Sequence, residues 1–270
     1  PYIQCTVTDQ SLSLASGQEL YVCPGNDFQA GSGDITLTDI EIDGSFTAIG
    51  EQTIYVAGKW DASGGVFIAA TSTVEFSSIG GTHRIFTNNQ PFYSVNFNGA
   101  GSEWTYVGTT TVQATTTISD GILNHGGDNN LDTRSLVIAD GASFVKATGT
   151  GLLIFEGDGQ VGYIEDNNPT PTNLGNVQIG YSPATTKLNS DFAAESLTVN
   201  AGDNFDTRGY EVDIVNFITV YGHYDCTADK ETDGTITTLG TDWTVDPGAT
   251  FTADTSTTTF DGTANSSINT

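Results

Sequence analysis

Alternation of apolar and polar residues is the main pattern in this chain. From Asp34 onward, Ile35, Leu37, Ile40 and Ile42 are separated by polar residues, and this period of two is typical of strands that bury one face. Short β-favouring segments of the same kind recur at 92–97, 115–118, 135–138, 196–199 and 212–215. No segment has a 3.6-residue apolar period, so we expect an all-β chain with almost no α-helix.

Turns rich in glycine, asparagine and aspartate separate these segments. Examples are Asn98-Gly99, Asp120-Gly121, Asp140-Gly141 and Asp261-Gly262, and such residues adopt the left-handed backbone angles that tight turns need. The intervals between strands are too short for helical crossovers. The polar segment 165–172 holds two prolines and predicts an exposed loop between blocks of strands.

Two internal repeats predict how the strands are arranged. The sequence of 127–134 nearly recurs at 202–208, and 74 residues separate Asp132 from Asp206. Segments 67–76 and 251–260 match without a gap, and 144–155 is a looser copy. Each copy reads as a strand, a corner of small residues and a second strand that ends on Phe. This pattern predicts a parallel β-helix or β-solenoid of stacked short strands, with tandem β-sandwich domains as the alternative.

The first 33 residues lack the repeat pattern and predict an N-terminal cap (1–33) before a repeat-built solenoid (34–270). Solenoids need atypical ends, because a bare coil exposes core and unpaired backbone groups. Cys5 and Cys23 lie close enough in sequence to form a disulfide in an oxidising compartment. Cys226 is left over, and we expect it to be a buried, reduced thiol.

Three phrases in the last third of the chain resemble a known class of repeats. They are 205–212 (FDTRGYEV), 243–251 (WTVDPGATF) and 255–262 (TSTTTFDG). In this order they resemble the Thr- and Gly-rich repeats of large secreted microbial cell-surface proteins, over roughly residues 42–270. The resemblance implies an extracellular β-solenoid with adhesive, sheath-like or filament-forming roles. The chain departs from the pattern at Arg134 and Arg208, where such repeats carry Asn, and in its cysteine-containing N-terminal segment.

Composition narrows the partners and the location. Seven basic residues against 33 acidic ones give a net charge of −26, which would repel nucleic acid and anionic membrane surfaces. No run reaches the roughly 18 apolar residues that span a bilayer, so we expect no membrane insertion. The sequence has no Met and begins at Pro1, as a mature exported protein or a fragment of a longer chain would. The expected location is extracellular or at the cell surface.

Oxygen-rich turns make calcium the one cofactor that the sequence suggests. Carboxylate and amide oxygens at short spacing are the ligands that Ca²⁺ prefers, although none of the turns matches an EF-hand loop. Asn and Asp also favour turns for conformational reasons alone. The candidate ligands are Asp128, Asn130, Asp132, Asp203, Asn204 and Asp206.

Residues that could support catalysis are scattered. A polysaccharide lyase on this fold would need a base and cationic groups, for which Arg134 and Arg208 are candidates, but each has an Asp two residues earlier that offers a structural partner. Carboxylates for glycoside hydrolysis could come from Asp225, Asp229, Glu231 and Asp233. The three histidines (His83, His125 and His223) lack metal-site spacing and are expected at turns or on the surface. We therefore expect the chain to have no enzymatic activity.

Aromatic residues offer either a sugar-binding row or core packing. Trp60 and Trp243 occupy comparable repeat positions, which favours stacking inside the core. An exposed row would instead suit glycans. The residues concerned are Trp60, Trp104, Trp243, Tyr106, Tyr210, Tyr221 and Tyr224.

The sequence as a whole favours a non-enzymatic extracellular structural protein. The last repeat copy is followed by only ten residues, which would leave a coil with an open edge, and stacking on another copy would cover it. We therefore predict the protomer of a cell-surface filament, sheath or layer that assembles head-to-tail or laterally. The alternatives are a carbohydrate-binding adhesin module, with cell-surface glycans as partners, and a β-helix polysaccharide lyase.

Overall fold

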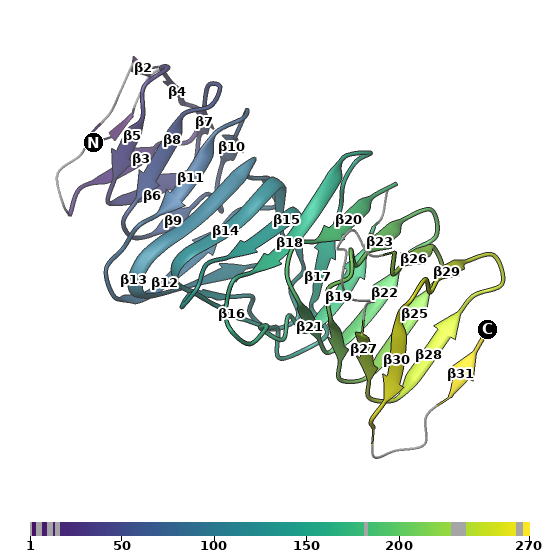
Figure 1. Ribbon diagram of the computed structural model, residues 1–270. Helices are drawn as coiled ribbons and strands as arrows, with labels where there is room; N and C mark the ends of the chain where they lie inside the picture. Colours follow the sequence, from purple (N-terminus) through teal and green to yellow (C-terminus); the bar gives the residue numbers. More distant parts are fainter. Residues whose placement is uncertain are drawn as a thin grey trace. The chain divides into compact units, whose positions relative to one another are not determined.

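The computed structural model describes residues 2–3, 7–9, 13, 17–180, 183–227, 236–262 and 267–270. Within these residues the chain is all β, and its strands stack in parallel as a β-solenoid of about 11 turns (Figure 1). The solenoid prediction is confirmed. Tandem sandwiches are wrong, because the described strands pair in parallel and sandwiches are built from antiparallel sheets. No helix capable of crossing a membrane occurs in this part of the chain.

The chain forms two compact units. Unit 1 comprises Pro1–Leu131 and Gly141–Val145, and unit 2 comprises Asp132–Asp140 and Lys146–Thr270. In each unit the coils repeat as three ladders of parallel strands, and a ladder is named below after one of its strands.

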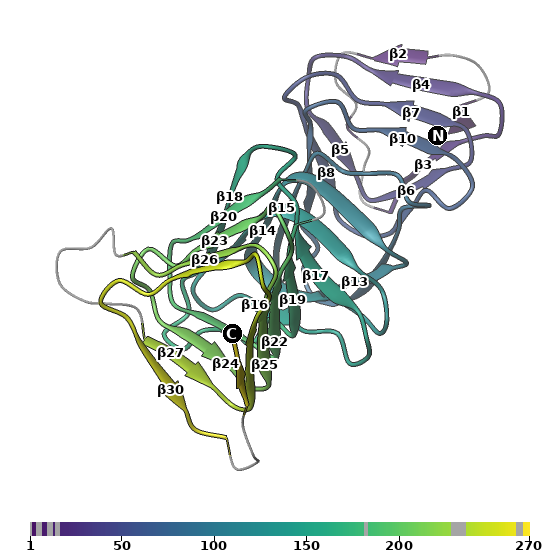
Figure 2. The ribbon, with the colours of Figure 1, turned by 90° about the vertical axis from the view of Figure 1, so that its right-hand side faces the viewer.

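The β6 ladder of unit 1 contains β1 (Tyr2–Ile3), β3 (Glu19–Val22), β6 (Asp39–Ile42), β9 (Trp60–Asp61) and β12 (Gly81–Phe86). The β8 ladder contains β5 (Ile35–Leu37), β8 (Thr53–Val56) and β11 (Thr73–Phe76). The β7 ladder contains β2 (Val7–Asp9), β4 (Asp27–Ala30), β7 (Ser45–Thr47) and β10 (Val66–Ile68). Figure 2 shows the four strands of the β7 ladder side by side.

Two long strands join the β6 and β8 ladders. β13 (Ser94–Val107) pairs with β11 through Ser94–Phe97 and with β12 through Ser102–Val107. β14 (Thr110–Asn124) continues along both halves of β13, with a register shift between them, and β16 (Ser143–Val145) follows its second half.

Unit 2 repeats the arrangement. The β25 ladder contains β17 (Leu152–Phe155), β19 (Asn176–Ile179), β22 (Ser196–Val199), β25 (Phe217–Val220), β28 (Asp242–Val245) and β31 (Ile268–Asn269). The β26 ladder contains β15 (Leu131–Ile138), β18 (Val161–Asp166), β20 (Thr185–Leu188), β23 (Asn204–Asp206), β26 (His223–Asp225) and β29 (Thr250–Thr252). The β27 ladder contains β21 (Phe192–Ala194), β24 (Val212–Ile214), β27 (Ile236–Leu239) and β30 (Thr257–Phe260).

The core is built from inward side chains that stack from coil to coil. In the β8 ladder, Ile54 pairs with Val74, which pairs with Val95, and all three are buried. The rings of Phe28, Phe46 and Phe67 form a similar column, with edge-to-face centroid distances of 5.1 and 5.5 Å. Each such aromatic pair contributes about 0.5–1.5 kcal/mol beyond the burial of its area. The alternation read from the sequence therefore places the core correctly.

The repeated corner motif also folds as predicted. In segment 67–76 the corner begins at Ala70 (φ 49°), and in segment 251–260 it begins at Asp254 (φ 46°). The turn closes in the same way in both copies: Ser72 N–H donates to the Ala69 carbonyl and Ser256 N–H to the Ala253 carbonyl. A left-handed residue at this point turns the chain from one ladder to the next.

The described residues cover only part of the predicted N-terminal cap. β3 and β4 of segment 1–33 already pair in parallel with β6 and β7. Cys23 is half-buried and forms no disulfide with a described cysteine, and Cys5 lies outside the described residues, so their disulfide remains a prediction. Cys226 is buried and forms no disulfide among the described residues.

Candidate assembly surface

The last coil of unit 2 exposes side chains at positions that earlier coils bury. In the β26 ladder, Phe205 pairs with Tyr224 and Tyr224 with Phe251. Phe205 and Tyr224 are fully buried, but Phe251 is 36% exposed. Phe251 therefore occupies the same inward position as Phe205 and Tyr224 but is less buried, and no pairing on its other side occurs among the described residues.

The β25 ladder shows the same gradient more strongly. Ile218 pairs with Trp243, and Trp243 pairs with Ile268. Ile218 and Trp243 are buried, whereas Ile268 is 63% exposed. In the β27 ladder the buried Leu239 pairs with the half-buried Phe260. All three ladders thus lose core burial at the same coil.

These side chains surround one apolar hollow. Its volume is about 350 Å³, and the rings of Trp243 and Phe251 meet beside it at a centroid distance of 4.9 Å. Apolar surface gathered in this way is stabilised when another apolar surface covers it. The residues that line the hollow are Trp243, Val245, Phe251, Thr258, Phe260, Ile268 and Thr270.

The structure separates the second set of predicted calcium ligands. Asp203 is buried, and its Oδ1 accepts a hydrogen bond of 2.7 Å from Ala184 N–H. Asn204 and Asp206 are the half-exposed residues of β23 on either side of the inward Phe205. Asp206 forms an ion pair of 2.9 Å with Lys187 and accepts a hydrogen bond from Arg208 N–H. These three side chains do not converge.

The first set of predicted ligands lies just before and at the start of β15. Asp128 is exposed, Asn130 is half-buried and Asp132 lies on β15. Across the part of the chain that the structure describes, no group of three or more His, Cys, Asp or Glu residues could hold a metal ion. Calcium at these turns therefore remains a prediction from sequence.

Asp203 has an acidic neighbour in Glu156. Burial raises the pKa of both carboxyl groups, and the charge of Asp203 raises the pKa of Glu156 further. This pair was not predicted from the sequence, because Glu156 lies outside both repeats. The proximity of these two carboxyl groups favours a proton on one of them as the pH falls.

The candidates for lyase or hydrolase chemistry make local contacts. Arg208 Nη1 donates a hydrogen bond of 2.6 Å to Asn189 Oδ1. Asp225 accepts hydrogen bonds from Thr227, which lower its pKa even though burial acts in the opposite direction. Arg134 is half-buried on β15. Asp229, Glu231 and Asp233 lie outside the described residues.

One of the positions predicted for the histidines and tryptophans is wrong. Trp60, Trp104 and Trp243 are buried, so the core interpretation of Trp60 and Trp243 is confirmed. His83 stacks on Trp104 at 5.8 Å, and His223 is half-buried on β26. His125 is buried, so its expected place at the surface is wrong. It follows a strand whose burial pattern continues into it.

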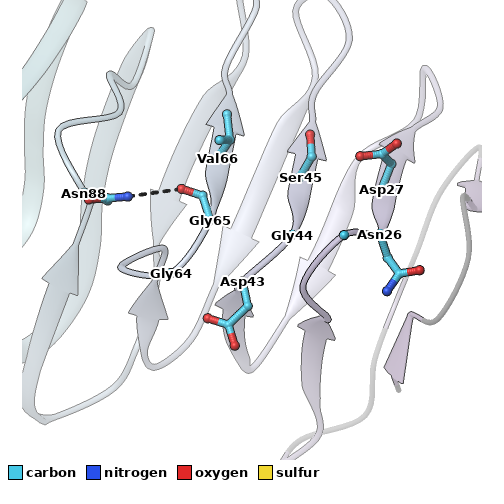
Figure 3. A pocket seen from close by; sticks show the side chains of 10 residues that line it. Asn26, Asp27, Asp43, Gly44, Ser45, Gly64, Gly65, Val66 and Asn88 are labelled. Carbon is cyan, nitrogen blue, oxygen red and sulfur yellow. Dashed lines mark hydrogen bonds between the residues drawn. The ribbon is translucent and has the colours of Figure 1, made fainter.

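A groove of about 430 Å³ follows one corner of unit 1 (Figure 3). Gly44 and Gly65 form its floor, because a Cβ at either position would approach a carbonyl oxygen of the preceding coil to 2.3 Å. The carboxylates of Asp27 and Asp43 lie on its walls and point in different directions in Figure 3. Asp43 already accepts a hydrogen bond of 2.7 Å from Tyr21 Oη. The groove is a consequence of close coil packing.

Sequence reasoning missed one exposed aromatic residue. Phe217, which begins β25, is 42% exposed and was not among the predicted aromatic candidates, whereas Tyr221, which follows the strand, was among them and is 46% exposed. Alternation places them on the same face as Thr219, but Ile218 and Val220 on the other face are equally apolar, so the pattern alone does not tell which face is buried. Tyr210 is half-buried, while Tyr106 and Tyr224 are in the core.

Comparison with known proteins adds no family or function. No protein-family model, no curated protein and no solved structure matches the chain.

Proposed function

We propose that the chain is a non-enzymatic structural protomer of an extracellular filament, sheath or layer, in which β-solenoid coils of neighbouring copies stack on one another. The observation that carries this proposal is the apolar last coil of unit 2. Residues of the same ladders are fully buried one coil earlier and exposed at Phe251 and Ile268. A coil from a second copy would supply an apolar surface for these residues and strands with parallel hydrogen-bonding edges.

The mechanism is mechanical. Parallel strands continue the backbone hydrogen-bond ladder across each junction, so load passes through many bonds at once. A contact between unlike ends need not close on itself, and where it does not close it generates an open fibre. The net charge of −26 keeps the assembled surface hydrated. The resemblance to secreted microbial cell-surface repeats supports an extracellular location.

The first test measures self-association of the 270-residue chain by sedimentation velocity and electron microscopy over a range of concentrations. We expect ordered fibres or concentration-dependent oligomers. Phe251→Asp and Ile268→Asp place a charge in the apolar hollow, and each is expected to weaken association at least tenfold. Repeating the measurement with a chelator tests the predicted calcium sites, because loss of order would support them.

Ile79→Asp is the matched control. Ile79 is an isoleucine in unit 1 that is 89% exposed, so its replacement adds the same charge outside the hollow and is expected to leave association unchanged. Circular dichroism verifies that each variant is folded. The proposal fails if the wild-type chain stays monomeric at high concentration, or if the Phe251 and Ile268 variants associate as the wild type does.

A further inference from the structure

The outer face of the β25 ladder carries two exposed aromatic rings on one strand. Phe217 begins β25, Thr219 lies two residues further on, and Tyr221 follows the end of the strand. The buried Ile218 and Val220 hold β25 against the core. The two aromatic residues therefore sit on a firm backbone about 13 Å apart, from four residues at the rise of a strand.

Hydroxyl groups line the strip between the two aromatic residues. Thr198, Thr219 and Thr244 are consecutive partners in the ladder, and all three are partly exposed. Within the described residues, no hydrogen bond occupies their hydroxyl groups, each of which can donate and accept. A ligand that lies across the ladder would meet three free hydroxyls in a row.

The flanking strands complete a polar frame. Asp242 pairs directly with Phe217 and is half-buried. Ser196 is also level with Phe217, because Leu197 pairs with Ile218, but it is buried and its hydroxyl donates to Asn176 Oδ1 at 2.8 Å. At the other end, Asn200 and Asp246 lie one residue beyond the paired Val199 and Val245, level with Tyr221. The frame thus offers amide and carboxylate groups, and no Lys or Arg occurs among these described positions.

Aromatic rings separated by hydroxyl, amide and carboxylate groups match the chemistry of a sugar chain. Pyranose rings have apolar C–H faces that stack on aromatic side chains, and their hydroxyls pair with polar groups at the ring edges. The charge of the strip decides which sugars fit. Asp242 and Asp246 would repel uronic or sulfated sugars, so the complementary ligand carries no acidic groups.

We propose that the outer face of the β25 ladder binds an extended, non-acidic glycan, with Phe217 and Tyr221 as stacking platforms and the threonine row as hydrogen-bonding partners. The strip belongs to the side of the unit 2 coils, whereas the proposed assembly surface is the last coil. Glycan binding thus does not depend on self-assembly, and either proposal can fail alone.

Isothermal titration of the full chain with soluble hexasaccharides tests this site. The panel contains neutral glucans, N-acetylated and deacetylated glucosamine oligomers, and a uronic acid oligomer. We expect binding of at least one non-acidic glycan and none of the uronate. Phe217→Ala combined with Tyr221→Ala is expected to weaken that binding at least tenfold. Both side chains are partly exposed, at 42% and 46%, so the double variant should keep the circular dichroism of the wild type.

Tyr163→Ala is the matched control, because Tyr163 is a 40% exposed tyrosine of the same unit on β18. It should leave glycan affinity unchanged. A second variant, Thr219→Lys, fills the strip between the rings and should also abolish binding. The proposal is overturned if no glycan binds, if only the uronate binds, or if the double variant binds as the wild type does. Loss of self-association in the double variant without any glycan binding would also overturn it and assign the strip to contact between copies.

Discussion

At the scale of single residues, glycine decides how closely two coils can approach. Gly44 and Gly65 occupy the same corner in successive coils, and their Cα atoms lie directly beneath backbone oxygens of the preceding coil. The φ angle of Gly65 is not in the left-handed region that favours glycine. Its requirement is therefore for space and not for conformational freedom.

Replacing Gly65 by Ala should destabilise the fold by about 1–3 kcal/mol, the usual range for overpacking. The added Cβ would lie 2.3 Å from the Gly44 carbonyl oxygen and 2.6 Å from that of Ile42. Gly127→Ala is the control, because the φ angle of Gly127 is also outside the left-handed region and nothing lies within 4 Å of its added Cβ. Urea unfolding measures both variants. Equal effects would contradict the steric explanation.

At the scale of elements, one buried histidine holds the seam between β14 and β16. His125 directly follows β14, and its backbone N–H donates to the Val145 carbonyl at 2.9 Å. The centroid of its ring lies 5.7 Å from that of Phe144. Nε2 is buried without a hydrogen-bond partner in the described structure. Burial lowers the pKa of His125 to about 4, although a hydrogen bond with the Asn129 backbone opposes the shift.

This seam should make unfolding dependent on pH between about 6.5 and 4. In that window the unfolded chain protonates His125 and the folded chain does not, so stability falls as the pH falls. The expected loss is about 1.4 kcal/mol per pH unit, or roughly 3 kcal/mol over the window. His125→Leu should remove this part of the slope in urea unfolding at pH 7, 6 and 5. Carboxylates titrate in both proteins, so the informative quantity is the difference in unfolding free energy between the wild type and the variant. A difference that stays the same at all three pH values would contradict the prediction.

The sequence predicted the positions of the strands better than the register in which successive coils align. Alternation located strands such as Ser196–Val199 without error, and the corner motif recurs with the same turn. The two near-copies at 127–134 and 202–208 are nevertheless out of register. Asp206 pairs with Lys187, which pairs with Tyr163, and that residue is level with Ser135 rather than Asp132. Coils of unequal length shift the copies, and sequence spacing does not show where the extra residues enter.

At the scale of the whole molecule, charge and apolar burial oppose each other in assembly. Every copy carries a net charge of −26, so copies that approach one another repel at long range. The proposed contact through the last coil is apolar and gains its stability at short range. Salt should therefore act mainly on the repulsion.

Self-association should increase as the salt concentration rises from about 0.01 to 1 M, because the screening length falls from roughly 30 to 3 Å. Sedimentation velocity at fixed protein concentration measures the effect. Ile268→Asp should associate weakly at both salt concentrations, which separates loss of the apolar contact from repulsion. If salt instead dissolved the oligomers, attraction between opposite charges would be their cause, and the apolar contact would be ruled out.

The candidate surfaces were less accessible to sequence reasoning than the fold. Phe251 and Ile268 look like ordinary core residues in the sequence, and only the pairing of strands shows that each has a described partner on one side alone. Phe217 and Tyr221 follow the same alternation as their buried neighbours. Asp203 and Asp206 were predicted to be ligands of one site, but their side chains lie on opposite faces of the chain at β23. In each case the missing information was which face of a strand points inward.

The unequal coils have a consequence for how such a chain can change over generations. Ile40 pairs with Trp60, 20 residues later, whereas Trp243 pairs with Ile268, 25 residues later. Corners thus absorb insertions without disturbing the strands. Duplication of a whole coil would lengthen the molecule while every neighbour-to-neighbour contact keeps its form. A single-residue deletion inside a strand would instead invert its faces and expel the core. Length is therefore the property that this architecture can vary most freely in evolution.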